Sequence, residues 1–404
     1  MFLTEEEFVN NTETKNFSQN VSLSYHLEDR NKNVPKLRFK GYNDEWKRVK
    51  TEEIFENISI KNNPLLPVLA VTQDKGVILR ESCGINIKYE NKSLKSYKIV
   101  KPGNFIISLR SFQGGLEYSE LEGIVSPAYT ILNNKQNISY DFFKYYFKTY
   151  NFIKSLNIAV EGIRDGKQIS YNSFKDIKIA FPSLSEQEKI ASFLILVDKK
   201  IEKQKELVEL LKKYKRGLLS AMFSQKLRFK DDKGNDYPTW EEKRLEEILK
   251  IKHGKSQKEI ECTNGKYPIL ATGGEIGRTN SCLWNKPCVL IGRKGTIDKP
   301  QYMETPFWTV DTLFYSEVFK DNNAKYLYYL FNTINWKKYD ESTGVPSLSA
   351  KTIERIKVTL SISYTEQTII SKNLSKFDDK IQQEECLLNY LQTYKKGLLQ
   401  QMFI

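Results

Sequence analysis

The residues whose spacing comes nearest to a catalytic motif are Asp74 and the run Glu90-Asn91-Lys92. An acidic residue followed at a distance by an acid-x-Lys run is a nuclease-like spacing, which would point to cleavage of a phosphodiester. However, 28% of the residues are charged, so spacings of this kind arise by chance. A single-chain nuclease therefore stays open as an alternative that the sequence supports weakly.

Other catalytic and ligand-binding motifs are absent from the sequence. The chain has five cysteines and two histidines, and no Cys-x-x-Cys pair, which argues against a structural zinc site or a disulfide framework and favours a reducing cytoplasm. No GxGxxG fingerprint follows a predicted strand, and no GxxxxGK[ST] loop or amino-methyltransferase Asn-Pro-Pro-aromatic motif occurs. We therefore expect a non-catalytic chain without a metal or cofactor of its own.

Polar, basic runs punctuated by glycine are the remaining candidates for a functional site. Arg and Gln side chains can read guanine and adenine edges, whereas Lys and Ser hold phosphates. The net charge of +13 and the pI of about 9.1 agree with a polyanionic partner. These runs predict a DNA-binding surface, and the alternative is that they are ordinary solvated turns. The candidate contact residues are Arg110, Ser111, Gln113, Arg164 and Lys167 in the first half of the chain, and Lys255, Ser256, Thr272, Arg278, Arg293, Lys294 and Thr296 in the second.

Two long repeated stretches must position these runs. Residues 186–223 and 366–403 align without a gap, and 16 of the 38 aligned positions are identical. Neither copy contains proline, and apolar residues recur with steps of three and four, which predicts two long helices that bury a narrow seam against each other. The seam residues are Leu194, Val197, Ile201, Gln204, Val208, Leu211 and Leu218 in the first copy, and Leu374, Phe377, Ile381, Glu384, Leu388, Leu391 and Leu398 in the second.

Polar residues within the seam predict how the two helices pair. Each helix leaves one region and arrives at the other, so we expect them to pack antiparallel. This pairing would bring Gln204 near Glu384 at the centre and would send Lys215 and Lys395 toward opposite ends. A buried polar pair of this kind more often sets register than adds stability.

A second repeated signature opens each half of the chain. Leu37-Arg38-Phe39, followed by Trp46, recurs as Leu227-Arg228-Phe229, followed by Trp240. Between each signature and the next long helix lies a region with strand patterns and one aromatic helical stretch, and the two regions barely resemble each other. The strand candidates are Pro67–Val71, Gly76–Leu79, Asn104–Leu109 and Ala128–Leu132, then Tyr267–Ala271, Pro287–Ile291 and Thr309–Tyr315, and the helical stretches are Tyr140–Phe152 and Ala324–Tyr339.

These patterns predict an α+β chain in which two mixed α/β domains are joined by a coiled coil of two long antiparallel helices. A pseudo-two-fold, circular organisation would bring the C-terminus beside residue 36. The expected divisions are a polar, mobile N-terminal extension (1–34), a first domain (35–184), a first helix (185–225), a second domain (226–364) and a second helix (365–404). Neither a signal peptide nor a membrane span is expected.

This arrangement resembles the specificity subunit of type I restriction-modification systems. The resemblance rests on Glu186-Gln187 and Glu366-Gln367 at the helix starts, on the Tyr-Lys-x-Gly-Leu-Leu runs from Tyr214 and Tyr394, and on the Gly-Arg-Lys-Gly-Thr-Ile-Asp run from Gly292. It implies a cytoplasmic, non-catalytic subunit whose two target-recognition domains bind a split, asymmetric sequence of double-stranded DNA. It also implies two methyltransferase subunits that carry S-adenosylmethionine, and two restriction subunits that use ATP and Mg. A free-standing two-headed DNA-binding or architectural protein is the alternative.

If the helices act as a ruler, their length sets the separation of the two DNA half-sites. Deleting one heptad from each copy (Lys200–Glu206 with Lys380–Cys386) keeps the seam in phase. It removes about 10 Å of helix, or about three base pairs of DNA. We expect a shorter spacer or lost binding, with the bases read in each half-site unchanged, when methylated sites are mapped by sequencing. An unchanged spacer at full occupancy would contradict the ruler.

Overall fold

The computed structural model describes residues 23–25, 33–73, 75–83, 91–160 and 169–404. The chain forms two compact units: residues 1–203 with 388–404 make the first unit, and residues 204–387 make the second. The division falls inside the two long helices, α7 (Leu184–Phe223) and α10 (Tyr364–Gln401), and not at their ends. Each unit therefore contains one part of each helix.

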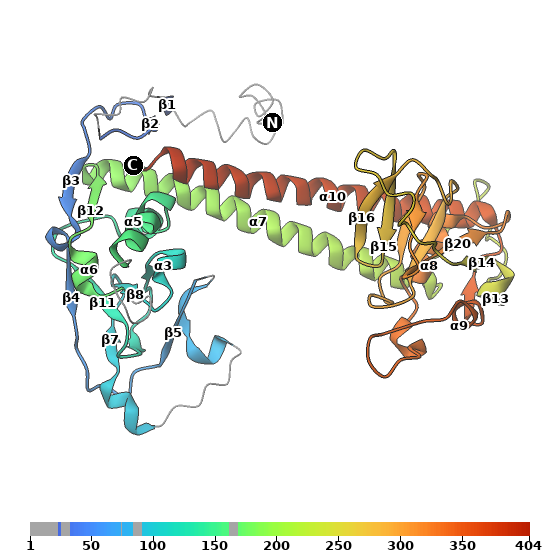
Figure 1. The fold of residues 1–404 in the computed structure, drawn as a ribbon, viewed down its shortest axis with the longest axis horizontal. Helices are drawn as coiled ribbons and strands as arrows, with labels where there is room; N and C mark the ends of the chain where they lie inside the picture. The colour runs from blue at the N-terminus through green and yellow to red at the C-terminus, as the bar shows by residue number, and fades with distance from the viewer. Residues whose placement is uncertain (1–22, 26–32, 74, 84–90, 161–168) are drawn as a thin grey trace. The chain divides into compact units, whose positions relative to one another are not determined.

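The first unit is built on a small antiparallel sheet. The four strands run in the order β4 (Phe55–Ile58), β11 (Thr130–Asn134), β8 (Phe105–Ile107) and β9 (Glu117–Tyr118). Two-stranded pairs surround it: β3 (Lys47–Lys50) with β12 (Lys178–Phe181), β5 (Leu69–Thr72) with β6 (Gly76–Leu79), and β7 (Lys98–Val100) with β10 (Gly123–Val125). Among the described residues, the unit also contains the helices α3 (Ser111–Gly114), α4 (Tyr140–Tyr146), α5 (Tyr150–Val160) and α6 (Tyr171–Lys175), of which α3, α5 and α6 are labelled in Figure 1.

The second unit repeats this plan. Its four-stranded antiparallel sheet has the order β14 (Leu249–Lys252), β20 (Leu313–Val318), β17 (Cys288–Gly292) and β18 (Gln301–Met303). A pair of strands, β13 (Glu241–Arg244) and β21 (Lys357–Leu360), matches β3 and β12. The remaining elements are β15 (Tyr267–Ala271), β16 (Gly274–Thr279), β19 (Trp308–Thr309), α8 (Ala324–Phe331) and α9 (Ala350–Glu354). The expected α+β class with two mixed domains is confirmed.

The ends of the long helices complete the two hydrophobic cores. In the first unit, Met402 and Phe403 are buried, and the Phe403 ring meets Trp46 edge-on at 6.4 Å. The C-terminus thus lies beside the leading signature, as the circular organisation predicts. In the second unit, Met222 is buried and the Phe223 ring meets Trp240 edge-on at 5.9 Å.

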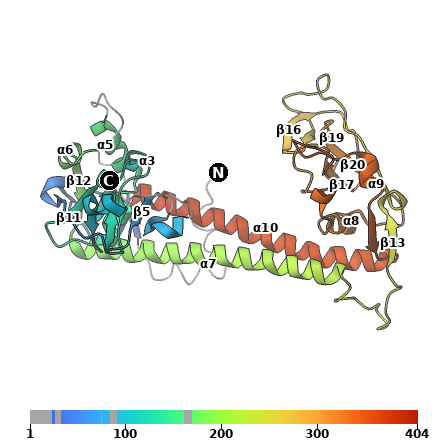
Figure 2. The same cartoon turned by 90° about the horizontal axis from the view of Figure 1, so that it is seen from below.

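The long helices pack antiparallel in each unit, as expected. In the second unit, Gln204 Nε2 donates to Glu384 Oε2 over 2.6 Å, and further along α7 Lys215 pairs with Asp378 on α10. In the first unit, Lys395 on α10 pairs with Asp198 on α7 over 2.5 Å. Figures 1 and 2 both show the two helices side by side. All fourteen expected seam residues are buried or half-buried.

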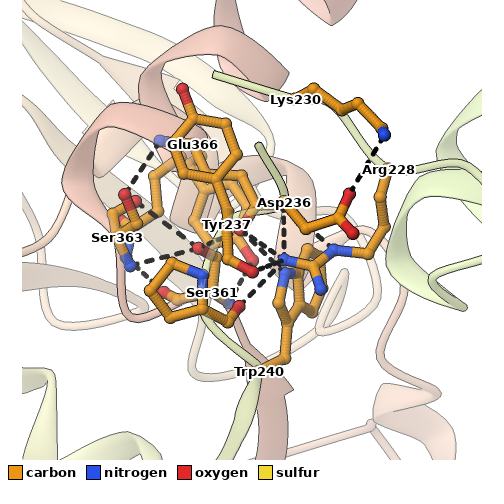
Figure 3. A network of polar contacts seen from close by, with 11 residues as sticks. Arg228, Lys230, Asp236, Tyr237, Trp240, Ser361, Ser363 and Glu366 are labelled. Atoms are coloured by element: carbon orange, nitrogen blue, oxygen red, sulfur yellow. Dashed lines mark hydrogen bonds and ion pairs between the residues drawn. The ribbon is translucent and has the colours of Figure 1, made fainter. Parts of the chain in front are cut away.

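A buried ion pair fixes the start of each long helix. Arg38 from β2 (Leu37–Phe39) donates to both carboxylate oxygens of Glu186 over 2.7 Å, and the two side chains are 2% and 1% exposed. The second unit repeats the contact, since Arg228 donates to Glu366 over 3.1 Å. Figure 3 shows Arg228 and Trp240 converging on Glu366, which also accepts a hydrogen bond from Ser361.

The glutamine that follows each glutamate ties the helix to its domain. Gln187 Oε1 accepts from the Ser139 amide just before α4, and Gln367 Oε1 accepts from the Asn323 amide just before α8. Their amide nitrogens donate to the carbonyls of Pro182 and Ser361. Because both glutamines are buried, these contacts replace hydrogen bonds to water that the side chains lose on folding.

Two expectations about local structure need correction. The stretches Tyr140–Phe152 and Ala324–Tyr339 are not single helices. The first breaks between α4 and α5, where the Thr149 hydroxyl accepts from the Phe152 amide and starts a new helix. The second ends at Phe331 and resumes as a 3-10 turn at Trp336–Tyr339.

The N-terminal extension, which was expected to be mobile, contains a strand at Leu23–Tyr25. These residues form β1, which pairs antiparallel with β2, the strand that carries Arg38. The rest of residues 1–32 lies outside the described part of the chain. In the part that the structure describes, no helix is long and apolar enough to cross a membrane.

A double-mutant cycle tests whether the buried Arg38–Glu186 pair holds the start of α7. Arg38→Met alone leaves Glu186 buried and unpaired, which should cost about 3–5 kcal/mol of unfolding free energy. The double variant R38M/E186M removes both charges and should recover most of that loss. Urea unfolding of the four proteins measures the coupling, and additive losses would show that the pair does not hold the helix start.

Candidate nucleic-acid interface

In each unit, a candidate loop follows the third strand of the four-stranded sheet, which is β8 in the first unit and β17 in the second. In the first unit, Ile106 of β8 pairs with Glu117, and Arg110 lies four residues further on. In the second unit, Leu290 of β17 holds the equivalent position, because it pairs with Tyr315 and Gln301 as Ile106 pairs with Ile131 and Glu117. Lys294 lies four residues further on and Arg293 three, so two regions of unrelated sequence place basic residues on the loop that follows the same strand.

Backbone contacts bring the loops of the second unit together around Arg293. The Lys255 amide donates to the Thr309 carbonyl over 2.8 Å, and the Trp308 indole donates to the Lys255 carbonyl over 2.9 Å. The Arg293 amide donates to the Thr312 carbonyl over 2.8 Å. Lys255, Thr272, Arg293, Lys294 and Thr296 thus lie on connected loops.

A concave surface of about 420 Å³ opens beside these loops. His253, Arg293, Lys294 and Lys351 line it, together with Glu341 and Ser347. Asp311 holds the Arg293 guanidinium over 2.5 Å and so sets the direction of the side chain, while Lys294 is exposed. The arrangement offers several cationic donors to one anionic or base-edge ligand.

Two of the predicted contact residues have a structural role in this cluster instead. The Thr272 hydroxyl donates to the Thr312 carbonyl over 2.8 Å, and the Thr296 hydroxyl donates to the Thr272 carbonyl over 3.0 Å. Both threonines are half-buried and brace the loops from inside. This corrects the expectation that their hydroxyls face DNA.

Arg278 and Ser256 lie apart from this cluster. Arg278 pairs with Pro268 near the far end of the β15–β16 hairpin from the Gly273 turn, and its Nε donates to the Gly265 carbonyl. Ser256 is exposed on the chain that continues from Lys255. Arg278 therefore lies on another part of the second unit than Arg293.

In the first unit, Arg110 and Gln113 are exposed, whereas Ser111 is not available for contact. The Ser111 side chain is 0% exposed, and its hydroxyl accepts from the Ser108 amide over 2.8 Å at the start of α3. That corrects the expectation for Ser111. Gln73, which the sequence did not single out, donates from its side chain to the Arg110 carbonyl.

Several predicted residues lie outside the described residues. These are Arg164 and Lys167 of the candidate interface, and Asp74 and Glu90 of the nuclease-like spacing. Among the residues that the structure describes, no group of three or more His, Cys, Asp or Glu side chains could hold a metal ion.

Burial raises the pKa of the Cys288 thiol to about 12, so this core cysteine stays protonated at neutral pH.

Comparison with known proteins identifies the family. The family model for the type I restriction modification DNA specificity domain matches residues 43–212 and 237–393, which is most of the chain. The chain belongs to this family. The two matched segments each take in one variable region and most of the long helix that follows it.

The individual relatives share only a modest fraction of their residues with this chain. The chain is similar to the type I restriction enzyme MjaIX specificity subunit of Methanocaldococcus jannaschii, with 26% identity over 188 residues, and the alignment covers 43% of each chain. It is also similar to the MjaVIII specificity subunit of that organism, with 28% identity over 187 residues, covering 44% of this chain and 42% of that one. The match thus spans less than half the length of these curated relatives.

A solved structure supports the fold. The type I restriction-modification S subunit from M. genitalium matches with a TM-score of 0.57 and 19% sequence identity. The match covers 92% of this chain and 99% of that one. At this identity the likeness speaks for the fold alone.

Gly254 tests whether close backbone approach holds the loops in place. A Cβ atom at Gly254 would lie 2.1 Å from the Val310 carbonyl oxygen, whereas a Cβ atom at Gly273 meets nothing within 4 Å. Gly254→Ala should therefore destabilise the protein by about 1–3 kcal/mol, since rigid backbone must shift. Gly273→Ala is the matched control and should be close to neutral. Thermal unfolding compares the two, and equal melting temperatures would show that the loop is pliable.

Proposed function

We propose that this chain is the DNA-recognition subunit of a type I restriction-modification complex. Its two units each read one half of an asymmetric, bipartite target through the loops that follow β8 and β17. The observation that carries the proposal is the placement of Arg110 and Arg293 on the loop that follows the same strand, in two regions of different sequence. Different loops on one scaffold suit two different half-sites.

The arginines are the groups with which each unit would specify bases. A guanidinium can donate two hydrogen bonds to the O6 and N7 atoms of guanine from a rigid planar fork, which a flexible lysine does not offer. In the second unit, Asp311 orients Arg293 and the neighbouring lysines are free to hold phosphates. We therefore assign base reading to the arginine and backbone contact to Lys255 and Lys294.

The repeated helices would dock the methyltransferase subunits. Leu207, Leu210 and Tyr214 follow one face of α7 and are 38%, 63% and 58% exposed. Apolar side chains at this helical spacing suit a partner helix. By the family resemblance, two methyltransferase subunits would supply S-adenosylmethionine, and two restriction subunits would supply ATP- and Mg-dependent translocation and cleavage.

An architectural DNA-binding protein that acts alone is the competing function. It would explain the basic loops but not the exposed apolar face of α7. Purification of the tagged chain from cells that also express the methyltransferase encoded with it separates the two functions. A stable complex is expected, and its absence would favour the free-standing protein.

Sequencing of methylated bases tests the assignment of the arginines. R293A should cost about 1–3 kcal/mol of target binding and relax the motif at one position in one half-site, because a bidentate base contact is lost. R110A should do the same in the other half-site. The matched control is R278A, which removes the same charge from β16 and should leave the motif intact. Relaxation of the same half by R110A and R293A would contradict two-headed reading.

A further inference from the structure

A second concave surface of the second unit is rich in lysine and lies away from the reading loops. It has a volume of about 710 Å³ and is lined by Lys286, Lys320, Lys325, Lys372 and Lys376, with Asp379 as the one acidic side chain in the lining. We call it the lysine groove. Lys372 and Lys376 come from α10, and Lys325 comes from the first turn of α8.

None of the five lysines forms an ion pair with a carboxylate among the residues that the structure describes, although Lys286 lies near enough to Glu317 to help lower the pKa of that carboxyl. Lys325 Nζ instead lies over the Tyr302 ring, 5.2 Å from its centroid. Other lysines of the same unit do form ion pairs, such as Lys252 with Glu317 over 2.9 Å and Lys357 with Glu242 over 2.7 Å. The groove lysines therefore lack direct ion pairs within the described chain, and an anionic ligand would supply them.

The repeat shows that the scaffold does not require these charges. Lys372 and Lys376 of α10 align with Ser192 and Leu196 of α7, while Leu374 between them aligns with an identical Leu194. Both leucines are fully buried. The buried leucine is thus the same in both copies, and at the two exposed positions beside it lysine appears in the second copy alone. If packing of the two helices required lysine at these positions, both copies would carry it.

The location of the groove separates it from the reading loops. Lys286 and Pro287 precede β17, whereas Arg293 follows the last residue of that strand. Five residues of extended chain span about 17 Å. The groove is therefore separate from the residues that would read bases around Arg293.

The lining is apolar as well as basic. Val318, Phe319 and Tyr364 contribute to it, and the latter two are 40% and 52% exposed. A DNA backbone presents charged phosphates without apolar side chains to cover these residues. A protein segment that combines acidic and apolar side chains complements both features.

We propose that the lysine groove docks an acidic, apolar-containing segment of a partner protein. The lysines attract and orient the segment, and Val318, Phe319 and Tyr364 take its apolar side chains. The proposal does not depend on the bases that the loops read. It makes the second unit different from the first as an interaction surface, although the long helices of both are repeats.

Fluorescence anisotropy with the full-length protein tests this proposal. The probe is a fluorescein-labelled peptide in which Glu alternates with Leu, and the reference peptide carries Gln in place of Glu. K372S/K376L takes the residues of the first helix copy at both positions, and K286Q/K320Q alters the opposite wall. Each double variant should weaken binding of the acidic peptide about tenfold, because two charge contacts are lost.

The controls separate the possible outcomes. K199Q/K200Q removes the same charge from α7 and should leave peptide binding unchanged, and all variants should bind a labelled DNA duplex as the wild type does. Equal binding of the Glu and Gln peptides by the wild type would overturn the proposal. So would equal weakening by K199Q/K200Q, which would show a general charge effect, or a parallel loss of duplex binding, which would show a nucleic-acid groove.

Discussion

The fold depends on a carboxylate that is buried at the first turn of each long helix. Glu186 and Glu366 are 1% and 0% exposed, so each charge must find a partner inside the protein. Arg38 and Arg228 provide it from the leading signature. Because an unpaired buried charge is so costly, the helix can begin only where that arginine lies. The contact therefore couples the start of a domain to the helix that leaves it, across more than a hundred residues of variable sequence.

A second repeated contact carries this constraint to the opposite helix. Asp198 accepts from the Tyr145 hydroxyl and pairs with Lys395, and Asp378 accepts from Tyr329 and pairs with Lys215. Burial and the neighbouring carboxylate raise the pKa of Tyr145 and Tyr329, so both phenols remain donors at neutral pH. Each aspartate thus joins one domain to both helices. These contacts fix the antiparallel register together with the Gln204–Glu384 pair.

The sequence predicted the repeated part of the molecule better than the variable part. Heptad spacing located the seam, and the polar pair Gln204 and Glu384 indicated its centre, because helix periodicity is written directly in the chain. The Arg38–Glu186 pair was missed, although both residues recur in the second copy and their shared repetition was a usable signal. The placement of Arg110 and Arg293 after equivalent strands could not be found from the sequence, since it depends on strand pairing in regions with little sequence in common. Nor does sequence tell whether a loop hydroxyl faces solvent or braces its own backbone, as those of Ser111, Thr272 and Thr296 do.

An internal repeat also supplies a control for every position at which its copies differ. Both copies carry the same structural contacts, so a residue needed for folding should be present twice, as Glu186, Gln187 and Asp198 are. Trp46 and Trp240 show that a conserved side chain can still be used differently, since Trp240 donates to Glu366 whereas Trp46 Nε1 has no partner among the described residues. Where one copy carries exposed lysine and the other carries serine or leucine, packing cannot be the cause, because the buried leucine beside them is unchanged. We infer that the two units bind different partners through such positions. These positions lie in the reading loops and on the exposed side of α10.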